Sequence, residues 1–266
     1  MKALTAALLL LAGPAAAHEF WLEPLDYVLP EGARIEARAL NGEFFEGIEY
    51  SYSERGYAQS GVVAAAERQP IPGEAGQRPA VSVPSLGTGL HVLYHASPAS
   101  KIVYNDMEKF ETFLRGKRLE DALDLHRARG FPEEGIVEGY HRFVKALVAV
   151  GGGAGEDQAV GMPFELVAET NPYTDSGEMV FRLLWQQAPD ANAPVFAFIK
   201  DEDGAVEEIL LRTDGEGLVR IPRRPGEVMV NAVRIVEANT ALKERFDALW
   251  MTLWAASTYQ IPADEG

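Results

Sequence analysis

The chain contains no cysteine. Disulfide bonds, thiolate nucleophiles and cysteine-ligated metals are therefore excluded. The chain also lacks a Gly-x-Ser-x-Gly turn, a His-Glu-x-x-His helix and a P-loop lysine, so three common catalytic and nucleotide-binding motifs are missing. Histidine is scarce as well, and the candidates for metal or acid–base chemistry reduce to His18, His91, His95, His126 and His141.

Positive charge is in short supply. The chain has 24 lysines and arginines against 40 aspartates and glutamates, which gives a formal net charge of −16. Such a surface repels phosphate groups, so we expect neither a nucleic-acid partner nor docking on anionic lipid. The charge is compatible with cation binding, although most acidic surfaces only keep a protein soluble.

Long apolar runs are also rare. The run at residues 4–12 is too short for a bilayer span, which needs about 20 residues. Lys2 precedes it and Ala15-Ala16-Ala17 follow it, the pattern of a secretory signal with an A-x-A cleavage site. We therefore predict that residues 1–17 are a signal peptide and that the mature chain is periplasmic and begins at His18. An uncleaved anchor is the alternative. No other run is apolar enough for stable membrane insertion.

Alternating apolar and polar residues predict strands in both halves of the chain. In the first half, strands are expected at 34–40, 48–52, 80–83 and 90–95, with a turn at Asn41-Gly42. In the second half they are expected at 164–168, 179–185, 194–199, 206–211, 217–221, 227–235 and 249–261. Short strands at this spacing favour an immunoglobulin-like sandwich.

The middle of the chain has a different period. Apolar residues recur at helical spacing in residues 107–114, 119–126 and 136–147, which predicts an insertion of two or three helices at about 105–150. The glycine-rich stretch 151–155 is typical of a linker.

These patterns together predict a mainly β fold of two immunoglobulin-like β-sandwich domains. The first domain would span residues 18–155 and carry the helical insertion, and the second would span residues 156–266.

A mature N-terminal histidine can bind metal in an unusual way. Its α-amine has an ordinary pKa of about 7.7–8.0, so part of it is neutral at physiological pH. The amine and the imidazole Nδ1 of His18 can chelate one ion, and a second imidazole would complete the arrangement called a histidine brace. Nitrogen ligands of this kind suit Cu²⁺ and Ni²⁺. The other amino-terminal copper–nickel motif needs histidine at the third mature position, which is Phe20 here.

The second imidazole has several candidates. His91 and His95 lie on one predicted strand about 13 Å apart, so a single ion cannot easily take both. His91 follows a glycine-flanked strand start and is expected near the rim, whereas His126 and His141 fall on predicted helices. We predict His18 and His91 as metal ligands, with His95 and His141 as weaker candidates. The simpler interpretations are a frayed terminus and a hydrogen-bonded strand histidine.

Several segments carry a resemblance to one family. The sequence resembles the periplasmic proteins grouped as domain of unknown function 4198, in its opening His-Glu-Phe-Trp-Leu-Glu-Pro at 18–24, Gly-Leu-His at 89–91, Glu-Lys-Phe at 108–110, the segment 140–147 and Asn-Pro-Tyr at 171–173. This resemblance implies an association with nickel or cobalt uptake systems. It supports His18 and His91 as the site, and does not clearly support His95 or His141.

The leading hypothesis is a periplasmic transition-metal-binding protein, not an enzyme, that is accessory to nickel, copper or cobalt uptake or homeostasis. Its cofactor or cargo would be a nickel or copper ion, and its partner a metal-uptake membrane transporter or an outer-membrane receptor. Two alternatives stay open. One is a copper-dependent oxidase or monooxygenase that uses the same histidine brace. The other is a metal-free β-sandwich binding module.

Overall fold

The computed structural model describes residues 18–263, so the predicted signal peptide at 1–17 lies outside the described residues. The fold is mainly β, as expected, with three helices among those residues. The helices are α1 (Met107–Gly116), α2 (Glu120–Ala128) and α3 (Thr240–Phe246). The strands are β1 (Glu19–Pro24), β2 (Val28–Leu29), β3 (Arg34–Glu43), β4 (Glu46–Tyr50), β5 (Ser60–Ala64), β6 (Glu67–Pro70), β7 (Val81–Pro84), β8 (Gly89–Ala96), β9 (Ser100–Tyr104), β10 (Ile136–Val150), β11 (Phe164–Ala168), β12 (Met179–Trp185), β13 (Ala188–Pro189), β14 (Pro194–Lys200), β15 (Val206–Arg212), β16 (Leu218–Ile221), β17 (Gly226–Glu237) and β18 (Trp250–Ile261).

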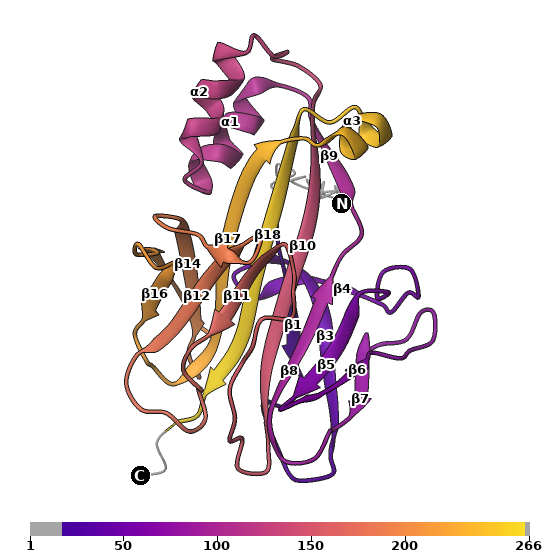
Figure 1. Cartoon of the computed structure of the whole chain (residues 1–266), viewed down its shortest axis with the longest axis vertical. Coiled ribbons are helices and arrows are strands. Elements are labelled where there is room, and N and C mark those ends of the chain that lie inside the picture. The colour runs from indigo at the N-terminus through magenta and orange to yellow at the C-terminus, as the bar shows by residue number, and fades with distance from the viewer. Residues whose placement is uncertain (1–17, 264–266) are drawn as a thin grey trace, which may run out of the picture.

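A ten-stranded sheet forms the centre of the molecule. Its main path runs β15-β14-β17-β18-β10-β8-β5-β6, and β2 and β9 also pair with β10. The long strands β10, β17 and β18 run side by side along the molecule, toward the end that carries α1, α2 and α3 (Figure 1). β10 and β18 are parallel, from the pair Glu138–Trp250 to the pair Ala146–Thr258.

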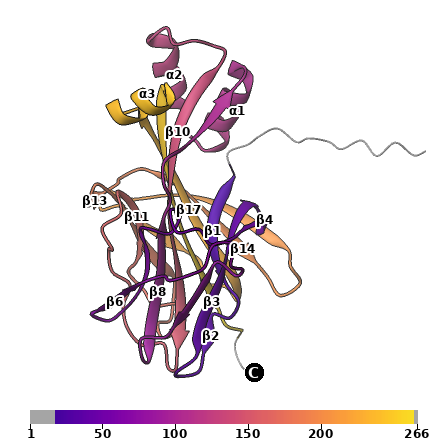
Figure 2. The same cartoon turned by 90° about the vertical axis from the view of Figure 1, so that its right-hand side faces the viewer.

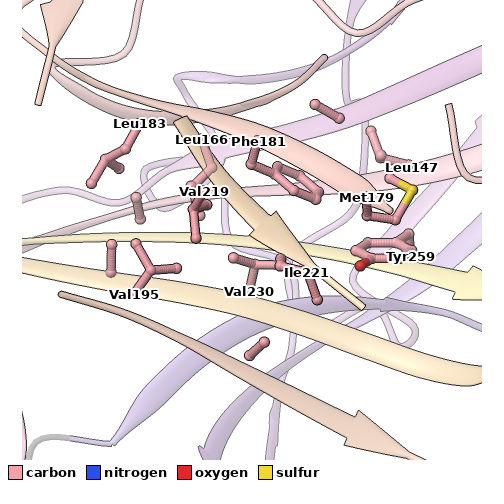
Figure 3. Packing of buried hydrophobic residues seen from close by; sticks show 14 of the residues in the cluster. Leu147, Leu166, Met179, Phe181, Leu183, Val195, Val219, Ile221, Val230 and Tyr259 are labelled. Carbon is pink, nitrogen blue, oxygen red and sulfur yellow. The ribbon is translucent and has the colours of Figure 1, made fainter. Parts of the chain in front are cut away.

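Two smaller sheets pack on the central one. β1, β3, β4 and β7 form one of them, and β11, β12, β13 and β16 form the other. Figure 2 shows the β1–β3 side and the β11–β13 side separated by the long strands. Leu166, Phe181, Val230 and Tyr259 belong to the core between the β11–β12 sheet and the central sheet (Figure 3).

The central sheet contains strands from both sides of the predicted boundary at residue 155. β8 and β10 come from the first half, and β14, β17 and β18 come from the second half. The division into two immunoglobulin-like sandwiches is therefore not confirmed, and it stays a prediction.

The helical insertion is confirmed in part. α1 begins at an Asp106 cap whose carboxylate accepts the Lys109 backbone N–H, and it buries Phe110, Phe113 and Leu114. α2 buries Ala122, Leu123 and His126. None of the helices within residues 18–263 is long and apolar enough to cross a membrane.

The third predicted helix is wrong, because residues 136–150 form β10. From Phe143 onward every β10 residue is buried, since neighbouring strands and both smaller sheets surround it. A strand buried on both faces has a continuous apolar sequence, which does not show the two-residue alternation of a half-buried strand. The helical placement of His141 is wrong for the same reason.

The predicted turn at Asn41-Gly42 and the predicted linker at 151–155 both need correction. Asn41-Gly42 lies within β3, and the hairpin turns instead at Phe44-Phe45, both at positive φ. The glycine-rich stretch 151–155 is held in place, because the Asn171 side chain donates to the carbonyls of Gly153 and Gly155 at 2.8 and 2.9 Å.

Candidate functional site

His18 immediately precedes β1 and faces the end of β3, since Glu19 pairs with Gly42. Its carbonyl accepts hydrogen bonds from Asn41 Nδ2 at 3.4 Å and from Arg142 Nη2 at 3.2 Å. Its Nδ1 is buried without a hydrogen-bond partner among the described residues. Glu43 Oε1 is 3.4 Å from that nitrogen. The structure thus holds the His18 backbone in place and leaves one imidazole nitrogen without a hydrogen bond, at ion-pair distance from a carboxylate.

Glu43 was not identifiable as a site residue from the sequence. It lies far from His18 along the chain, and only the antiparallel pairing of β1 with β3 brings the two together. Metal–nitrogen and metal–oxygen bonds are about 2.0–2.2 Å long, so two ligands of one ion lie about 3 Å apart. The 3.4 Å separation between His18 Nδ1 and Glu43 Oε1 is close to that spacing.

His91 is fully buried, and both its ring nitrogens are used by the backbone. Its Nε2 accepts from the Leu86 N–H at 2.9 Å, and its Nδ1 donates to the Gly89 carbonyl at 3.0 Å. Burial lowers the pKa of His91, which favours the neutral ring that these two bonds require. This imidazole holds the loop before β8, and no nitrogen remains for a metal.

His18 and His91 also lie at different places along β10. The His18 carbonyl bonds to Arg142, whereas His91 pairs with Val148. Six residues along a strand span about 20 Å. The structure therefore does not bring together His18 and His91, the two histidines predicted from the sequence to bind one metal ion.

His95 lies on the same side of the fold as His18. The Phe20 ring, two residues after His18, packs on the His95 ring with the centroids 5.4 Å apart. The His95 Nδ1 shares a 2.8 Å hydrogen bond with Ser60 Oγ. Burial, with a smaller contribution from the Arg142 cation, lowers the pKa of His95 to about 4. This imidazole is therefore neutral at pH 7, the form in which histidine binds metals.

His141 and His126 have other surroundings. The His141 side chain lines a cavity of 630 Å³ with Phe143, whose ring stacks on it at 5.9 Å. Its neighbour Arg142 faces the other side of β10, because successive strand residues alternate. His126 is buried under α2, where its Nδ1 accepts from Trp250 Nε1 at 3.0 Å and its Nε2 donates to the Pro132 carbonyl at 3.0 Å. His126 is a packing residue.

Within residues 18–263, no three His, Asp or Glu side chains gather as a group that could hold a metal ion. His18 and Glu43 supply two such side chains. A three-ligand site at this position would therefore need another type of donor, such as the α-amine that cleavage before His18 would create.

A family model described as "Domain of unknown function (DUF4198)" matches residues 15–235. The chain belongs to this family. The DUF4198 match covers His18, Glu43, His91 and His95 together with the β1–β3 pairing that assembles the candidate site. No curated protein and no solved structure matches the chain.

Proposed function

We propose that this DUF4198 protein is a periplasmic transition-metal-binding protein, accessory to nickel or copper uptake or homeostasis. The observation that carries the proposal is the His18 Nδ1, which makes no hydrogen bond to the described residues and lies 3.4 Å from Glu43 Oε1. A buried polar atom without a hydrogen bond is costly, and a metal ion would satisfy the His18 Nδ1 and take an oxygen ligand from the exposed Glu43 side chain.

The proposed ligands are the α-amine and Nδ1 of mature His18 and the carboxylate of Glu43. Cleavage after Ala17 supplies the amine, which replaces the amide nitrogen of the longer chain. Two nitrogens and one carboxylate oxygen suit Cu²⁺ and Ni²⁺. The acidic chain, with its net charge of −16, attracts cations to the surface around the site.

The structure gives a reason to assign the second imidazole of the brace to a different histidine. His91 has no free nitrogen, whereas His95 is neutral and contacts Phe20 next to the site. We therefore favour His95 over His91 as a further contributor. Its Nδ1 is engaged by Ser60, so only Nε2 is available to a metal.

The first experiment tests the amine. N-terminal sequencing of the exported protein should give His18 as the first residue. Calorimetric titration with Ni²⁺ and Cu²⁺ then compares this form with a protein that carries one extra glycine before His18. The extra residue removes the amine chelate and keeps the imidazole, so we expect affinity to fall at least about tenfold. Equal affinities would show that the amine is not a ligand.

The second experiment tests the carboxylate. Glu43→Gln keeps the shape of the side chain and removes its charge, so we expect metal affinity to fall at least about tenfold. Glu31→Gln, an exposed carboxylate in the turn before β3, is the matched control and should bind as the unaltered protein does. If both variants bind alike, Glu43 is not a ligand.

We propose a carrier rather than an enzyme. The same ligands could support a copper-dependent oxidation, because copper bound in this way can cycle between two oxidation states. Consumption of ascorbate and O₂ by the copper-loaded protein, above the rate given by free copper, would favour the enzyme instead.

A further inference from the structure

A second feature beside His18 is a cavity of 340 Å³ between β1, β8 and β10. This volume is near the lower end of small-molecule sites, which span about 300–1,000 Å³. Aromatic rings from Phe20, Tyr50, Tyr57 and Tyr140 line it. The polar side chains in the lining are those of His95, Arg142 and four serines, Ser51, Ser53, Ser97 and Ser100. The cavity therefore combines flat apolar walls with a cation.

Arg142 is the unusual member of this lining. Its guanidinium carbon lies 4.8 Å from the centre of the Tyr140 ring and 5.6 Å from that of the Phe20 ring. Its Nη2 donates to the His18 carbonyl, but its Nε is buried without a partner. No carboxylate within residues 18–263 forms an ion pair with it, although the chain has an excess of acidic residues. Glu138 and Glu19 stabilise its charge from beyond ion-pair distance. A partly buried cation without a direct ion pair is costly, and an anionic ligand would offset that cost.

Tyr57 carries a second unpaired polar group in the same lining. The residue is only 6 % exposed, and its hydroxyl has no hydrogen-bond partner among the described residues. Its ring is held between Tyr52 and His95, with centroids 4.9 and 4.6 Å away. Burial raises the pKa of the Tyr57 hydroxyl well above its ordinary value, so the group is a donor at neutral pH.

We propose that this cavity binds a small planar carboxylate that bears an aromatic ring. Its carboxylate pairs with the Arg142 guanidinium, whose fork matches two oxygens, and accepts a hydrogen bond from the Tyr57 hydroxyl. Its ring packs against the aromatic lining. An aromatic carboxylate fits better than an inorganic anion, because the lining offers ring faces from five residues, Phe20, Tyr50, Tyr57, His95 and Tyr140, which an inorganic anion would leave unused. The proposal does not depend on a metal at His18.

The test uses benzoate as the probe and the mature protein in the presence of a chelator, so that no metal contributes. Calorimetric titration should give a benzoate Kd below about 1 mM. Benzamide, which has the same ring without the charge, should bind at least about tenfold more weakly. Inorganic phosphate should compete poorly. Absence of benzoate binding, equal binding of benzamide, or efficient competition by phosphate would each overturn the proposal.

Two variants place the ligand in the cavity. Arg142→Gln should abolish benzoate binding, but it also removes a bond to the His18 carbonyl and so could impair folding. Tyr57→Phe removes only a hydroxyl that bonds to none of the described residues, so the melting temperature should stay unchanged or rise. Its benzoate affinity should nevertheless fall about fivefold.

The matched control is Tyr94→Phe. Tyr94 precedes His95 on β8, and strand alternation directs it to the opposite face of the sheet. This variant should bind benzoate as the unaltered protein does. If Tyr57→Phe also retains full affinity, the Tyr57 hydroxyl does not contact the ligand and the proposal is wrong.

Discussion

His95 shows how one buried side chain links stability to pH. Its pKa is about 4 in the folded protein, below the ordinary value of 6.5, because burial disfavours the charged ring. The unfolded chain therefore binds more protons between these two values. The contribution of a neutral His95 is complete above about pH 6.5 and is lost as the pH falls to about 4, by about 3 kcal/mol in all.

The variant His95→Asn tests this linkage. We expect urea unfolding of the variant to show a shallower loss of stability between pH 6.5 and 4 than the unaltered protein shows, whatever its stability at pH 7. Ser60→Ala is the control, because it removes the partner of Nδ1 and keeps the imidazole. An unchanged slope in His95→Asn would mean that another group dominates.

Glu138 has the opposite effect on the pH dependence of stability. Burial raises the pKa of this carboxyl to about 7, although Tyr104 and Thr252 donate hydrogen bonds to it. The folded state then binds the proton more tightly than the unfolded state does. Its stabilising effect is present below the ordinary pKa of 4.5 and is lost as the pH rises through about 7.

We therefore expect Glu138→Gln to be more stable than the unaltered protein at pH 8, by up to about 3 kcal/mol. A glutamine amide can still accept from Tyr104 and donate to Thr252. The advantage should disappear at pH 4.5, where the carboxyl is already protonated. Urea unfolding at the two pH values measures the difference, and an equal advantage at both would contradict the linkage.

Among the elements, the β3–β4 hairpin positions Glu43 of the candidate metal site. Its two turn residues, Phe44 and Phe45, have φ of 52° and 63°, values that aromatic residues rarely adopt. Packing compensates for this, because Phe44 contacts Phe198 and Phe45 contacts Trp21, at centroid distances of 5.5 and 6.1 Å. Sequence rules place the turn at Asn41-Gly42 because they contain no information on these distant contacts.

A substitution at Gly42 tests whether the geometry of this hairpin positions Glu43 beside His18. A Cβ at this position would overlap the backbone of Glu46 and Gly47 on the facing strand. We expect Gly42→Ala to destabilise the protein by about 1–3 kcal/mol and to lower metal affinity, because Glu43 is displaced from His18. Gly116→Ala in α1, where an added Cβ would meet no atom beyond its chain neighbours and the backbone of its own helix, is the control and should not be destabilising. Thermal unfolding and metal titration of both variants measure the effects.

β10 shows most clearly what local sequence could and could not predict. Strands β14, β15, β17 and β18 were found at their predicted places, because their apolar runs lie between clear turn signals. β10 was missed because burial on both faces removes the alternation. Only one of the two side chains of the candidate site could be predicted, because the other depends on a strand pairing that local sequence does not reveal. His18 is marked by its position in the sequence, but Glu43 becomes its neighbour only through the pairing of β1 with β3.

At the scale of the whole molecule, a buried charge cluster joins the two halves of the chain. Lys145 on β10 contacts Asp157 Oδ1 at 3.1 Å and Glu165 Oε1 at 2.7 Å, and all three side chains are at most 1 % exposed. Glu165 also accepts the backbone N–H groups of Val160, Gly161 and Met162. The cluster therefore attaches the segment after residue 155 to the central sheet.

Removal of the cation would leave two buried carboxylates without a counter-ion, although both keep their hydrogen bonds to backbone N–H groups. We expect Lys145→Met to lower the free energy of unfolding by about 3–5 kcal/mol. Lys109→Met removes only an exposed ion pair with Asp106 and should change the free energy of unfolding by less than about 1 kcal/mol.

Differential scanning calorimetry also tests the predicted division into two domains at residue 155. Because β10 and β18 pair in one sheet, a single transition should move as a whole in Lys145→Met. Two transitions, of which only one moves, would instead show that the halves unfold as separate domains.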